Sequence, residues 1–347
     1  MRPRDFKGPI QSTRIAPLLR YIRYLDAVGA PVERLLARSA IPAELLDHPM
    51  AAVPHKNALR FVELACRSVG TEHVGLYVGL ESGLDNLGPY GEMLQRALTL
   101  HEYLRKGISL YNTTNTGQRL WLTNHGEELR FRVSSLDETG VAAYQEEMEA
   151  LVVTLARCKQ AAGPEWSPGE IRLAHRPKEA LPDIELFHGS RILSGTGETY
   201  FTLPPALLQR RFPNAGRRAT SSGDDPTPPA EGPLPEDLGG LVQLEIRYLL
   251  PHRIHQIDVI AEALAMSSRS LQRALASQGL SYSRILDEVR LRQAADWLEN
   301  TDKQVEEIAV DLGYTDASNF ARAFRRQSGV SPQAFRRDRE IDSPQDR

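Results

Sequence analysis

The sequence is poor in cysteine. It has two cysteines in 347 residues, Cys66 and Cys158, which are far apart and each lie in an apolar stretch with helical periodicity. Two such residues cannot form a disulfide framework or a clustered metal site. We therefore expect both to be reduced packing residues.

Long apolar runs are also missing. No run approaches the roughly 18 residues that a membrane helix needs, and the first seven residues, 1–7, lack the apolar core of a signal peptide. The net charge of −3 offers no polybasic tail. These features predict a cytoplasmic protein without membrane contact.

Catalytic and metal motifs are equally scarce. The segment 195–199, Gly-Thr-Gly-Glu-Thr, lacks the Gly-Lys-Ser/Thr ending that holds phosphates, so we expect a hairpin turn there. His252 and His255 could share a helical face, but no third metal ligand is nearby and Pro251 favours a helix start. No carboxylate pair stands in a recognisable catalytic motif. The sequence therefore predicts no enzyme, no cofactor and no metal site.

A segment without apolar periodicity divides the chain. Residues 214–240 include Ser-Ser-Gly-Asp-Asp-Pro-Thr-Pro-Pro-Ala at 221–230, a composition typical of a flexible linker. We expect a folded domain over 1–213, a second over 241–338 and a short tail over 339–347. A chain of this length can bury two cores.

The first domain mixes helical and strand patterns. Apolar stripes predict four helices, at Ile15 to Ala27, Asn57 to Val69, Met93 to Tyr111 and Val141 to Ala162. Alternating residues predict strands at 120–122 and 129–133, joined by a hairpin turn at His125-Gly126, and further strands at 171–175 and 198–203. The expected class of this domain is α+β.

The second domain contains one pattern twice. Ile257, Ile260, Ala261 and Leu264 form a helical stripe that recurs, 48 residues later, as Val305, Ile308, Ala309 and Leu312. Each stripe is followed by a short polar break and a second apolar helix, which predicts two helix-turn-helix units over about 257–279 and 305–328. Gly313 suits a left-handed helix end, whereas the first unit has Ala265 there. Ser268 and Asp316 are the expected caps of the second helices.

The second helix of each unit leaves polar residues exposed. These are Arg269, Gln272 and Arg273 in the first unit and Asn319, Arg322, Arg325 and Arg326 in the second. Arginine can bond bidentately to guanine, and Gln or Asn to adenine. Asn319 lies near the start of its helix, so a capping or packing role remains an alternative to DNA contact.

One helix is expected between the two units. Tyr282 to Asn300 carries Ile285, Val289, Ala294 and Leu298 at helical spacing. A helix of about 18 residues is about 27 Å long, which can hold two recognition helices near the ~34 Å that separates successive major grooves. The architecture predicted for this domain is all-α, with two helix-turn-helix units joined by a linker helix.

Charge in this domain is segregated and not in excess. From residue 241 to 347 there are 15 Lys plus Arg and 16 Asp plus Glu. The arginines gather on the second helices and at Arg336, Arg337 and Arg339, whereas acidic residues lie on the linker helix and at Glu306 and Glu307. Such segregation still predicts a positive DNA face and binding that weakens with salt.

Four motifs in this domain resemble a known family. They are Arg290-Leu291-x-x-Ala294, Ile308-Ala309-x-x-Leu312-Gly313-Tyr314, Ser318-Asn319-Phe320-x-Arg322-x-Phe324-Arg325, and Gly329-Val330-Ser331-Pro332 followed by Phe335-Arg336. They are similar to the DNA-binding domain of the AraC/XylS family of bacterial transcription regulators. This resemblance implies base contacts at Arg269, Gln272, Arg273, Ala317, Ser318, Ala321 and Arg322. Together with the exposed residues, the expected DNA-binding set is Arg269, Ser270, Gln272, Arg273, Ala317, Ser318, Asn319, Ala321, Arg322, Arg325 and Arg326.

The first domain resembles the arabinose-binding-type sensor found in some of these regulators. The residues that carry this are Leu45-Leu46 to Val53-Pro54, Val74-Gly75-Leu76, Leu87-Gly88-Pro89-Tyr90-Gly91 and Thr99-Leu100-His101-Glu102-Tyr103-Leu104. The resemblance implies a domain for effector sensing and dimerisation, without identifying the effector. The expected partners are double-stranded promoter DNA, RNA polymerase, a small-molecule effector and a second copy of the chain.

The sequence thus predicts an effector-responsive DNA-binding transcription regulator, with activation favoured by family analogy alone. The alternative is a ligand-binding or enzymatic protein whose C-terminal helices mediate protein contacts. The effector and its binding residues, the operator, the target genes, the sign of regulation and the dimer interface are not determined by the sequence.

Overall fold

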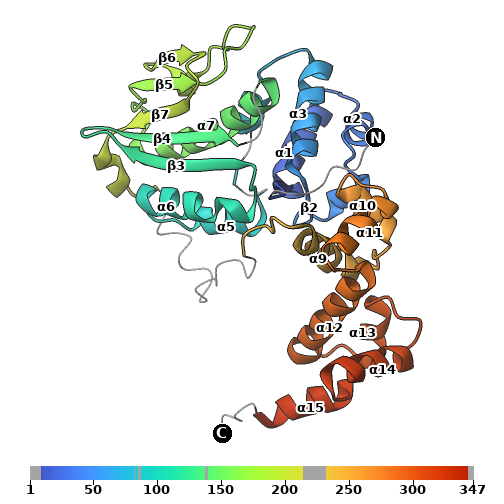
Figure 1. Cartoon of the computed structure of the whole chain (residues 1–347). Coiled ribbons are helices and arrows are strands. Elements are labelled where there is room, and N and C mark those ends of the chain that lie inside the picture. Colours follow the sequence, from blue (N-terminus) through green and yellow to red (C-terminus); the bar gives the residue numbers. More distant parts are fainter. Residues whose placement is uncertain (1–8, 82, 85–86, 137–139, 214–231, 343–347) are drawn as a thin grey trace. The chain divides into compact units, whose positions relative to one another are not determined.

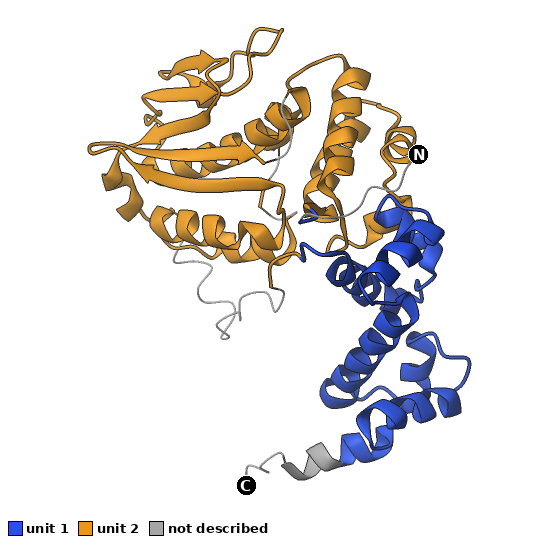
Figure 2. Cartoon of the chain, viewed as in Figure 1, with its two compact units in different colours: residues 1–10, 235–347 blue, residues 11–234 orange. Residues whose placement is uncertain are grey.

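The structure, a computed structural model, describes residues 9–81, 83–84, 87–136, 140–213 and 232–342. The chain divides into two compact units (Figure 2). The N-terminal unit comprises Gln11–Leu234, and the C-terminal unit comprises Pro235–Arg347 together with Met1–Ile10. Most of the predicted linker, 214–231, and the end of the predicted tail, 343–347, lie outside the described residues.

The N-terminal unit combines helices with two sheets (Figure 1). Its helices are α1 (Ile15–Ala27), α2 (Val32–Arg38), α3 (His55–Val69), α4 (Val74–Glu81), α5 (Gly88–Gln95), α6 (Leu100–Leu110) and α7 (Val141–Ala162), with short 3₁₀ turns η1 (Ala43–Asp47), η2 (Tyr111–Thr113), η3 (Glu185–Phe187) and η4 (Pro205–Gln209). Its strands are β1 (Ser12–Arg14), β2 (Ala52–Pro54), β3 (Gln118–Asn124), β4 (Leu129–Ser135), β5 (Glu170–Leu173), β6 (Arg191–Ser194) and β7 (Thr199–Leu203). The α+β class predicted for this unit is confirmed.

The larger sheet has the strand order β3-β4-β7-β5-β6. Its pairs are antiparallel except β5 with β6, which is parallel. Phe131 of β4 lies opposite Phe201 of β7, and their ring centroids are 5.3 Å apart on the face that packs against α7. Met148 and Leu155 of α7 are fully buried in the same core. Because strand side chains alternate between faces, the residues between these aromatic positions face the opposite side.

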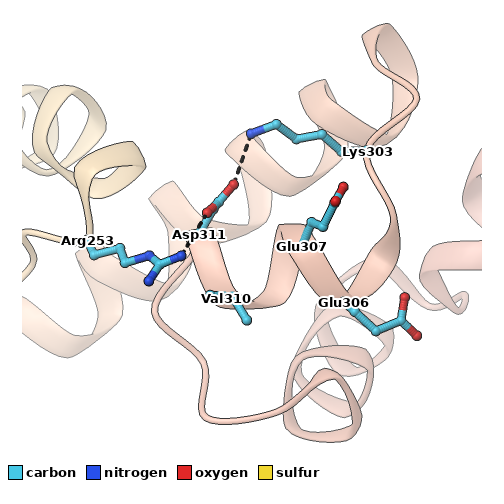
Figure 3. A pocket seen from close by; sticks show the side chains of 6 residues that line it. All are labelled: Arg253, Lys303, Glu306, Glu307, Val310 and Asp311. Atoms are coloured by element: carbon cyan, nitrogen blue, oxygen red, sulfur yellow. Dashed lines mark hydrogen bonds and ion pairs between the residues drawn. The ribbon is translucent and has the colours of Figure 1, made fainter.

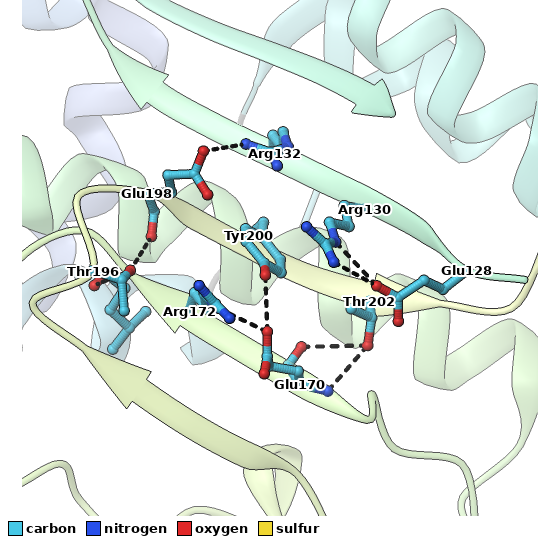
Figure 4. A network of polar contacts seen from close by, with 10 residues as sticks. Glu128, Arg130, Arg132, Glu170, Arg172, Thr196, Glu198, Tyr200 and Thr202 are labelled. Carbon is cyan, nitrogen blue, oxygen red and sulfur yellow. Dashed lines mark hydrogen bonds and ion pairs between the residues drawn. The ribbon is translucent and has the colours of Figure 1, made fainter. Parts of the chain in front are cut away.

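That opposite face is built from arginines around one tyrosine (Figure 4). The guanidinium carbons of Arg130, Arg132 and Arg172 lie 4.9, 5.1 and 5.6 Å from the ring centroid of Tyr200. The Tyr200 hydroxyl donates to Glu170 Oε1 at 2.8 Å. The stacked arginine stems bury the ring completely while their charged ends stay partly exposed, as is typical of long cationic side chains.

The turn expected at 195–199 is not a hairpin turn. The strands on either side of it, β6 and β7, both pair with β5 and not with each other. The turn therefore passes over the end of β5, where the amides of Gly195 and Gly197 donate to the carbonyls of His175 and Ala174 at 3.2 Å. The sequence indicates a turn here, but β6 carries no strand pattern, so the pairing of both strands with β5 does not follow from the sequence.

The single helix expected over 93–111 is two helices. Helix α5 ends at Gln95 and α6 begins at Leu100. Thr99 caps α6 by accepting from the Glu102 amide at 3.2 Å, and Glu102 Oε2 accepts from the Leu98 amide at 2.8 Å. This reciprocal capping starts a new helix and interrupts the apolar stripe.

Both cysteines are free and buried, as expected. Burial raises the pKa of the Cys66 thiol to about 12, which keeps it protonated at neutral pH. Among the described residues, no helix has both the length and the apolar content that a membrane span requires.

The C-terminal unit is all helical where it is described. It contains α9 (Leu238–Leu249), the 3₁₀ turn η5 (Leu250–His252), α10 (Ile257–Ala263), α11 (Ser268–Ser277), α12 (Tyr282–Asn300), α13 (Val305–Asp311), α14 (Ala317–Ser328) and α15 (Pro332–Asp342). Helix α12 contacts α9 toward the first helix-turn-helix unit and α13, α14 and α15 in the second. The predicted linker helix is confirmed, and it begins and ends at the predicted residues, 282 and 300.

The boundaries of this unit extend beyond those expected. Helix α9 begins at Leu238, inside the predicted linker, because the Asp237 side chain accepts from the Gly240 amide at 2.8 Å and caps it. Pro251 does not start a helix but lies in η5, which continues the last turn of α9. Helix α15 runs to Asp342, into the predicted tail.

Candidate nucleic-acid interface

Each helix-turn-helix unit buries one face of both its helices. The stripe residues Ile260, Ala261, Leu264, Ile308, Ala309 and Leu312 are all nearly inaccessible, as are Leu271 and Leu275 of α11 and Phe320 and Phe324 of α14. In the second unit Tyr314, Phe320, Phe324 and Phe335 follow one another with ring centroids 5.4 to 5.7 Å apart. The inner face of each second helix is thus occupied by the core, and the outer face is left for another partner.

The turns of the two units have the same backbone geometry. Gly313 has φ 74° and Ala265 has φ 55°, so both lie in the left-handed region. The next residue closes the turn in both: the Tyr314 amide donates to Ala309 at 2.9 Å, and the Met266 amide donates to Ala261 at 2.8 Å. The role predicted for Gly313 is confirmed, and the first unit makes the same turn with a residue that is strained there.

The second helices are capped by short polar side chains. Asp316 Oδ1 accepts from the Asn319 amide at 2.7 Å, as expected. In the first unit the cap is Ser267, which accepts from the Ser270 amide at 3.2 Å, and not Ser268, which is already helical and donates instead to Asp258. The cap therefore lies two residues after the left-handed Ala265, whereas Asp316 lies three residues after Gly313. The Ser270 hydroxyl accepts from the Ser267 hydroxyl at 2.9 Å, so it takes part in this cap.

The outer face of α11 is polar and accessible. Arg269, Gln272 and Arg273 are exposed on it. Within the described residues, no hydrogen bond or ion pair engages these three side chains. They are therefore available to a partner without loss of an internal contact.

The outer face of α14 is partly organised by its own cap. The Asn319 amide nitrogen donates to Thr315 Oγ1 at 2.9 Å and to Asp316 Oδ2 at 2.6 Å. Its carbonyl oxygen accepts from Arg322 Nη2 at 2.5 Å. This arrangement supports the capping role for Asn319, and it directs the Arg322 guanidinium along the exposed side of the helix.

The other expected contact residues of α14 fall into two groups. Ser318, Arg325 and Arg326 are exposed, whereas Ala317 and Ala321 are half-buried and present only methyl groups. The structure thus brings the predicted residues onto two helical faces, one in each unit.

Arg290 of α12 holds the turn of the second unit. Its Nε donates to the Leu312 carbonyl at 2.8 Å and its Nη2 to the Gly313 carbonyl at 3.3 Å. The guanidinium carbon also lies 4.7 Å from the centroid of the Tyr314 ring. Arg290 belongs to a motif that resembles the AraC/XylS family, but the resemblance implies no role for it. Its contacts make it a positioning residue for the turn that precedes α14.

An ion pair connects Arg253, just before the first helix-turn-helix unit, to Asp311 in the second (Figure 3). Arg253 Nη2 lies 3.6 Å from Asp311 Oδ1, and Lys303 Nζ lies 2.9 Å from Asp311 Oδ2. These three residues line a shallow depression with Glu306, Glu307 and Val310. The Tyr282 hydroxyl of α12 donates to the His255 carbonyl at 2.7 Å. Helix α12 is therefore bonded to the segment that leads into α10 and, through Arg290, to the turn before α14, which limits the relative motion of the two helix-turn-helix units.

Not every arginine that was assigned to the positive face is free to contact DNA. Arg336 donates to the Leu298 carbonyl at 3.3 Å and to the Lys303 carbonyl at 2.7 Å, so it joins α15 to the end of α12. Arg337 is exposed. The side chain of Arg339 lies outside the described residues.

Comparison with known proteins connects both units to one family. Residues 29–212 match the model of the arabinose-binding domain of AraC transcription regulator, N-term, and residues 260–338 match that of a helix-turn-helix domain. The transcriptional regulator VirS of Mycobacterium tuberculosis is 26% identical over 331 residues, covering 93% of this chain and 96% of that protein. The ornithine utilization regulator of Pseudomonas aeruginosa is 41% identical over 99 residues, covering 28% and 29%. The crystal structure of the regulator CdpR from Pseudomonas aeruginosa aligns with a TM-score of 0.38 at 22% identity, covering 88% of this chain and 96% of that one.

Proposed function

This chain belongs to the AraC family of DNA-binding transcription regulators, and from that premise we propose that α11 and α14 enter two successive major grooves of one promoter. The protein is a regulator with a ligand-binding N-terminal domain and a helix-turn-helix C-terminal domain. The observation that carries the proposal is the pair of exposed polar helix faces, held apart by one helix that is bonded to the segment before α10 and to the turn before α14.

The length of α12 agrees with this geometry. Its 19 residues make a helix of about 28 Å, close to the ~34 Å between successive major grooves on one face of DNA. The bonds from Tyr282 to His255, just before α10, and from Arg290 to the turn before α14 restrict the separation of α11 and α14. A restricted separation favours sites in which two blocks of sequence have a constant spacing.

The two helices are expected to discriminate bases to different degrees. Helix α11 offers Arg269, Gln272 and Arg273, all of which can bond base edges. Helix α14 offers Arg322 and the methyl groups of Ala317 and Ala321, which can contact thymine only through apolar surface. We therefore expect the block bound by α11 to be the more stringent one.

The N-terminal unit supplies the regulatory input in this proposal. A small-molecule effector binds there and changes dimer geometry or domain docking, which alters how the second unit engages DNA or contacts RNA polymerase. Activation is the expected sign, by analogy with the family. No catalytic step is part of the proposal. Because promoter DNA lies in the cytoplasm of a bacterium, the proposed function also places the protein there.

The test is the selection of binding sites from random duplexes by the full chain, in the presence and absence of a cell metabolite extract. An asymmetric site with two blocks about one helical turn apart is expected. An Arg273→Ala, Arg322→Ala double variant should lose the sequence preference. A single arginine that bonds a guanine contributes about 1 to 3 kcal/mol to specific binding, and the loss on random DNA should be smaller.

A matched control separates base contacts from bulk charge. Arg284 and Arg292 are exposed on α12, so an Arg284→Ala, Arg292→Ala variant removes the same charge from the linker helix. It should keep the selected sequence. Equal loss in both double variants would assign Arg273 and Arg322 to phosphate contacts, and a lack of any enriched sequence would favour protein partners for α11 and α14.

A further inference from the structure

A buried polar cluster lies beside α7 in the N-terminal unit. Its members come from α1, α3, η2, β3, α7 and the loop that precedes β3. They are Arg20, His55, Tyr111, Asn115, Gln118, Glu146 and Glu149. Burying this many polar groups is costly unless their hydrogen-bonding atoms are satisfied.

Arg20 is the least satisfied member. Its side chain is 3% exposed, and its Nη1 forms an ion pair with Glu149. Its Nε and Nη2 are buried and have no protein partner. Among the described residues, Arg20 is the only side chain with two such atoms. These two nitrogens form one edge of the planar guanidinium, the edge that binds a carboxylate through two parallel hydrogen bonds.

In Gln118 and Glu146, only one of the two terminal polar atoms of the side chain has a protein partner. Gln118 Oε1 accepts from the Tyr111 hydroxyl, while Gln118 Nε2 is buried without a partner. Glu146 Oε1 accepts from Asn115 Nδ2 at 2.7 Å and contacts His55 Nε2 at 2.8 Å, while its Oε2 is buried without a partner. The cluster therefore offers three free donor nitrogens and one free acceptor oxygen.

These atoms belong to one site and not to scattered positions. The pKa of the Tyr111 hydroxyl is raised well above its usual range by burial, then by Glu146 and Glu149, whereas Arg20 lowers it. Burial also raises the pKa of Glu149, with Arg20 lowering it and Glu146 raising it again. The geometry agrees: Glu149, which pairs with Arg20, lies one turn from Glu146 on α7. Glu146 is bonded to Asn115, three residues before Gln118, and Gln118 is bonded to Tyr111.

Two other buried charged residues in this unit, Glu147 and Arg14, have hydrogen-bond partners that can be compared with those of Arg20. Glu147 accepts from the Ser135 amide at 3.0 Å and from the Thr199 hydroxyl at 2.5 Å, so both of its oxygens are used. Arg14 donates to the carbonyls of Thr113 and Met50. The deficit at Arg20 is therefore larger than that of the other buried charged groups nearby.

We propose that Arg20, Gln118 and Glu146 form the effector site of the N-terminal unit and that it binds a zwitterionic amino acid. The carboxylate of the ligand takes the free edge of Arg20 and the Gln118 amide, and its ammonium group donates to Glu146 Oε2. This inference rests on the proposed effector function and adds to it the site and the chemical class of ligand.

Charge decides between an amino acid and a simple organic acid. Each carboxylate of the cluster already has a basic partner, since Glu149 pairs with Arg20 and Glu146 contacts His55, so no cation is left over for a further anion. A further anion would add uncompensated negative charge to a buried site, which is strongly unfavourable. A zwitterion brings one charge of each sign and leaves the balance of the cluster unchanged.

The test measures the thermal midpoint of the full chain with each standard L-amino acid in turn. A ligand that binds only the folded state raises this midpoint. For any amino acid that does so, two analogues are compared: its amide, which lacks the carboxylate, and its deaminated acid, which lacks the ammonium group. Both should bind at least 10-fold more weakly by calorimetry.

Isosteric variants assign the binding to these side chains. Glu146→Gln keeps an oxygen for His55 and Asn115 but replaces the free acceptor with a donor, and Gln118→Glu keeps the acceptor for Tyr111 but removes the free donor. Each should raise Kd by roughly 10- to 100-fold, the range for hydrogen bonds to charged groups. An Arg20→Met, Glu149→Gln double variant avoids a stranded carboxylate and should abolish binding. The control is Arg23→Met, on the exposed side of α1, which should bind normally.

Two results would overturn the site: no standard L-amino acid raises the midpoint, or one does so and the three site variants bind it as tightly as the unsubstituted chain and the Arg23→Met control. The proposed effector function is tested separately by DNA affinity. If metabolite extract changes that affinity while amino acids do not bind, sensing stands and this site is wrong. If an amino acid binds through Arg20 without changing DNA affinity, the site stands and its coupling to DNA binding is wrong.

Discussion

The turn that precedes α14 should depend on a residue that lies outside both α11 and α14. Arg290 bonds the carbonyls of Leu312 and Gly313 and stacks on Tyr314. Its side chain is 14% exposed, so these bonds are largely shielded from water. Replacing it with alanine removes both hydrogen bonds and the stacking contact at once.

The cost of Arg290→Ala can be estimated from these contacts. A hydrogen bond to a charged group contributes about 1.5 to 3 kcal/mol, and a partly buried cation–π contact about 1 kcal/mol. The carbonyls regain some hydration in the variant, so we expect a net loss of about 3 kcal/mol in the local stability of the turn. That corresponds to a roughly 150-fold increase in its opening.

Hydrogen exchange of the full chain measures this opening directly. The amides of Leu312, Gly313 and Tyr314 donate within the turn at 3.0, 3.0 and 2.9 Å, so each exchanges only when the turn opens. Exchange of these amides should be about 100-fold faster in Arg290→Ala. Arg290→Lys keeps the charge but loses the planar fork and should show an intermediate effect, about 10-fold.

Arg292→Ala is the matched control, because it removes an exposed arginine two residues away on the same helix. Surface substitutions of this kind usually change stability by less than about 0.5 kcal/mol. If the amides of the turn exchange no faster in Arg290→Ala than in Arg292→Ala, the contacts of Arg290 do not hold the turn and the reasoning is wrong.

Three further predictions concern the C-terminal unit. Ala265→Gly should raise its thermal midpoint, since relief of left-handed strain is favourable by about 1 kcal/mol. Gly313→Ala should lower the midpoint, because a Cβ there would lie 2.6 Å from the His255 ring. Similar midpoints for the two variants would contradict this reasoning. Burial, and secondarily the nearby Arg290, lowers the pKa of His255. The unfolded chain therefore takes up the proton first as pH falls, and stability should be lost below about pH 6.5. Calorimetric scans across this range should show a smaller loss of stability in His255→Asn. Asn319→Ala removes part of the α14 cap and the partner of Arg322, so specific DNA affinity in a fluorescence titration should fall by roughly 5- to 10-fold, as loss of a cap is about 1 kcal/mol.

Long periodic helices could be predicted because local signals mark both ends. Helix α12 starts where Ser281 accepts from the Arg284 amide at 3.3 Å, and α7 lies between Gly140 and Gly163, both at positive φ. Polar caps and glycines are visible in a sequence without knowledge of the tertiary fold. The break at Thr99 was also visible, as Thr-x-x-Glu, but the continuous apolar stripe through it concealed the new helix start.

Strand pairing and buried charge could not be predicted in the same way. The four residues of β6 show no clear alternation, and the parallel pairing with β5 depends on partners distant in the chain. Arg20 and Glu149 occupy positions that a helical pattern assigns to solvent, yet tertiary packing buries both. A sequence therefore indicates where a sensor domain lies more readily than where it holds its ligand.

The arginines of the C-terminal unit show why charge counts are a poor guide to a DNA interface. Arg290 and Arg336 bond backbone carbonyls and position helices, so their charges support the shape of the interface. Arg269 and Arg273, by contrast, are exposed without such contacts in the part of the chain that the structure describes. Both kinds contribute equally to a net charge near zero, but only the second kind can exchange water for phosphates and bases. The distribution of free donors over α11 and α14, and not the sum of charges, is therefore what suits a nearly neutral unit to a polyanion.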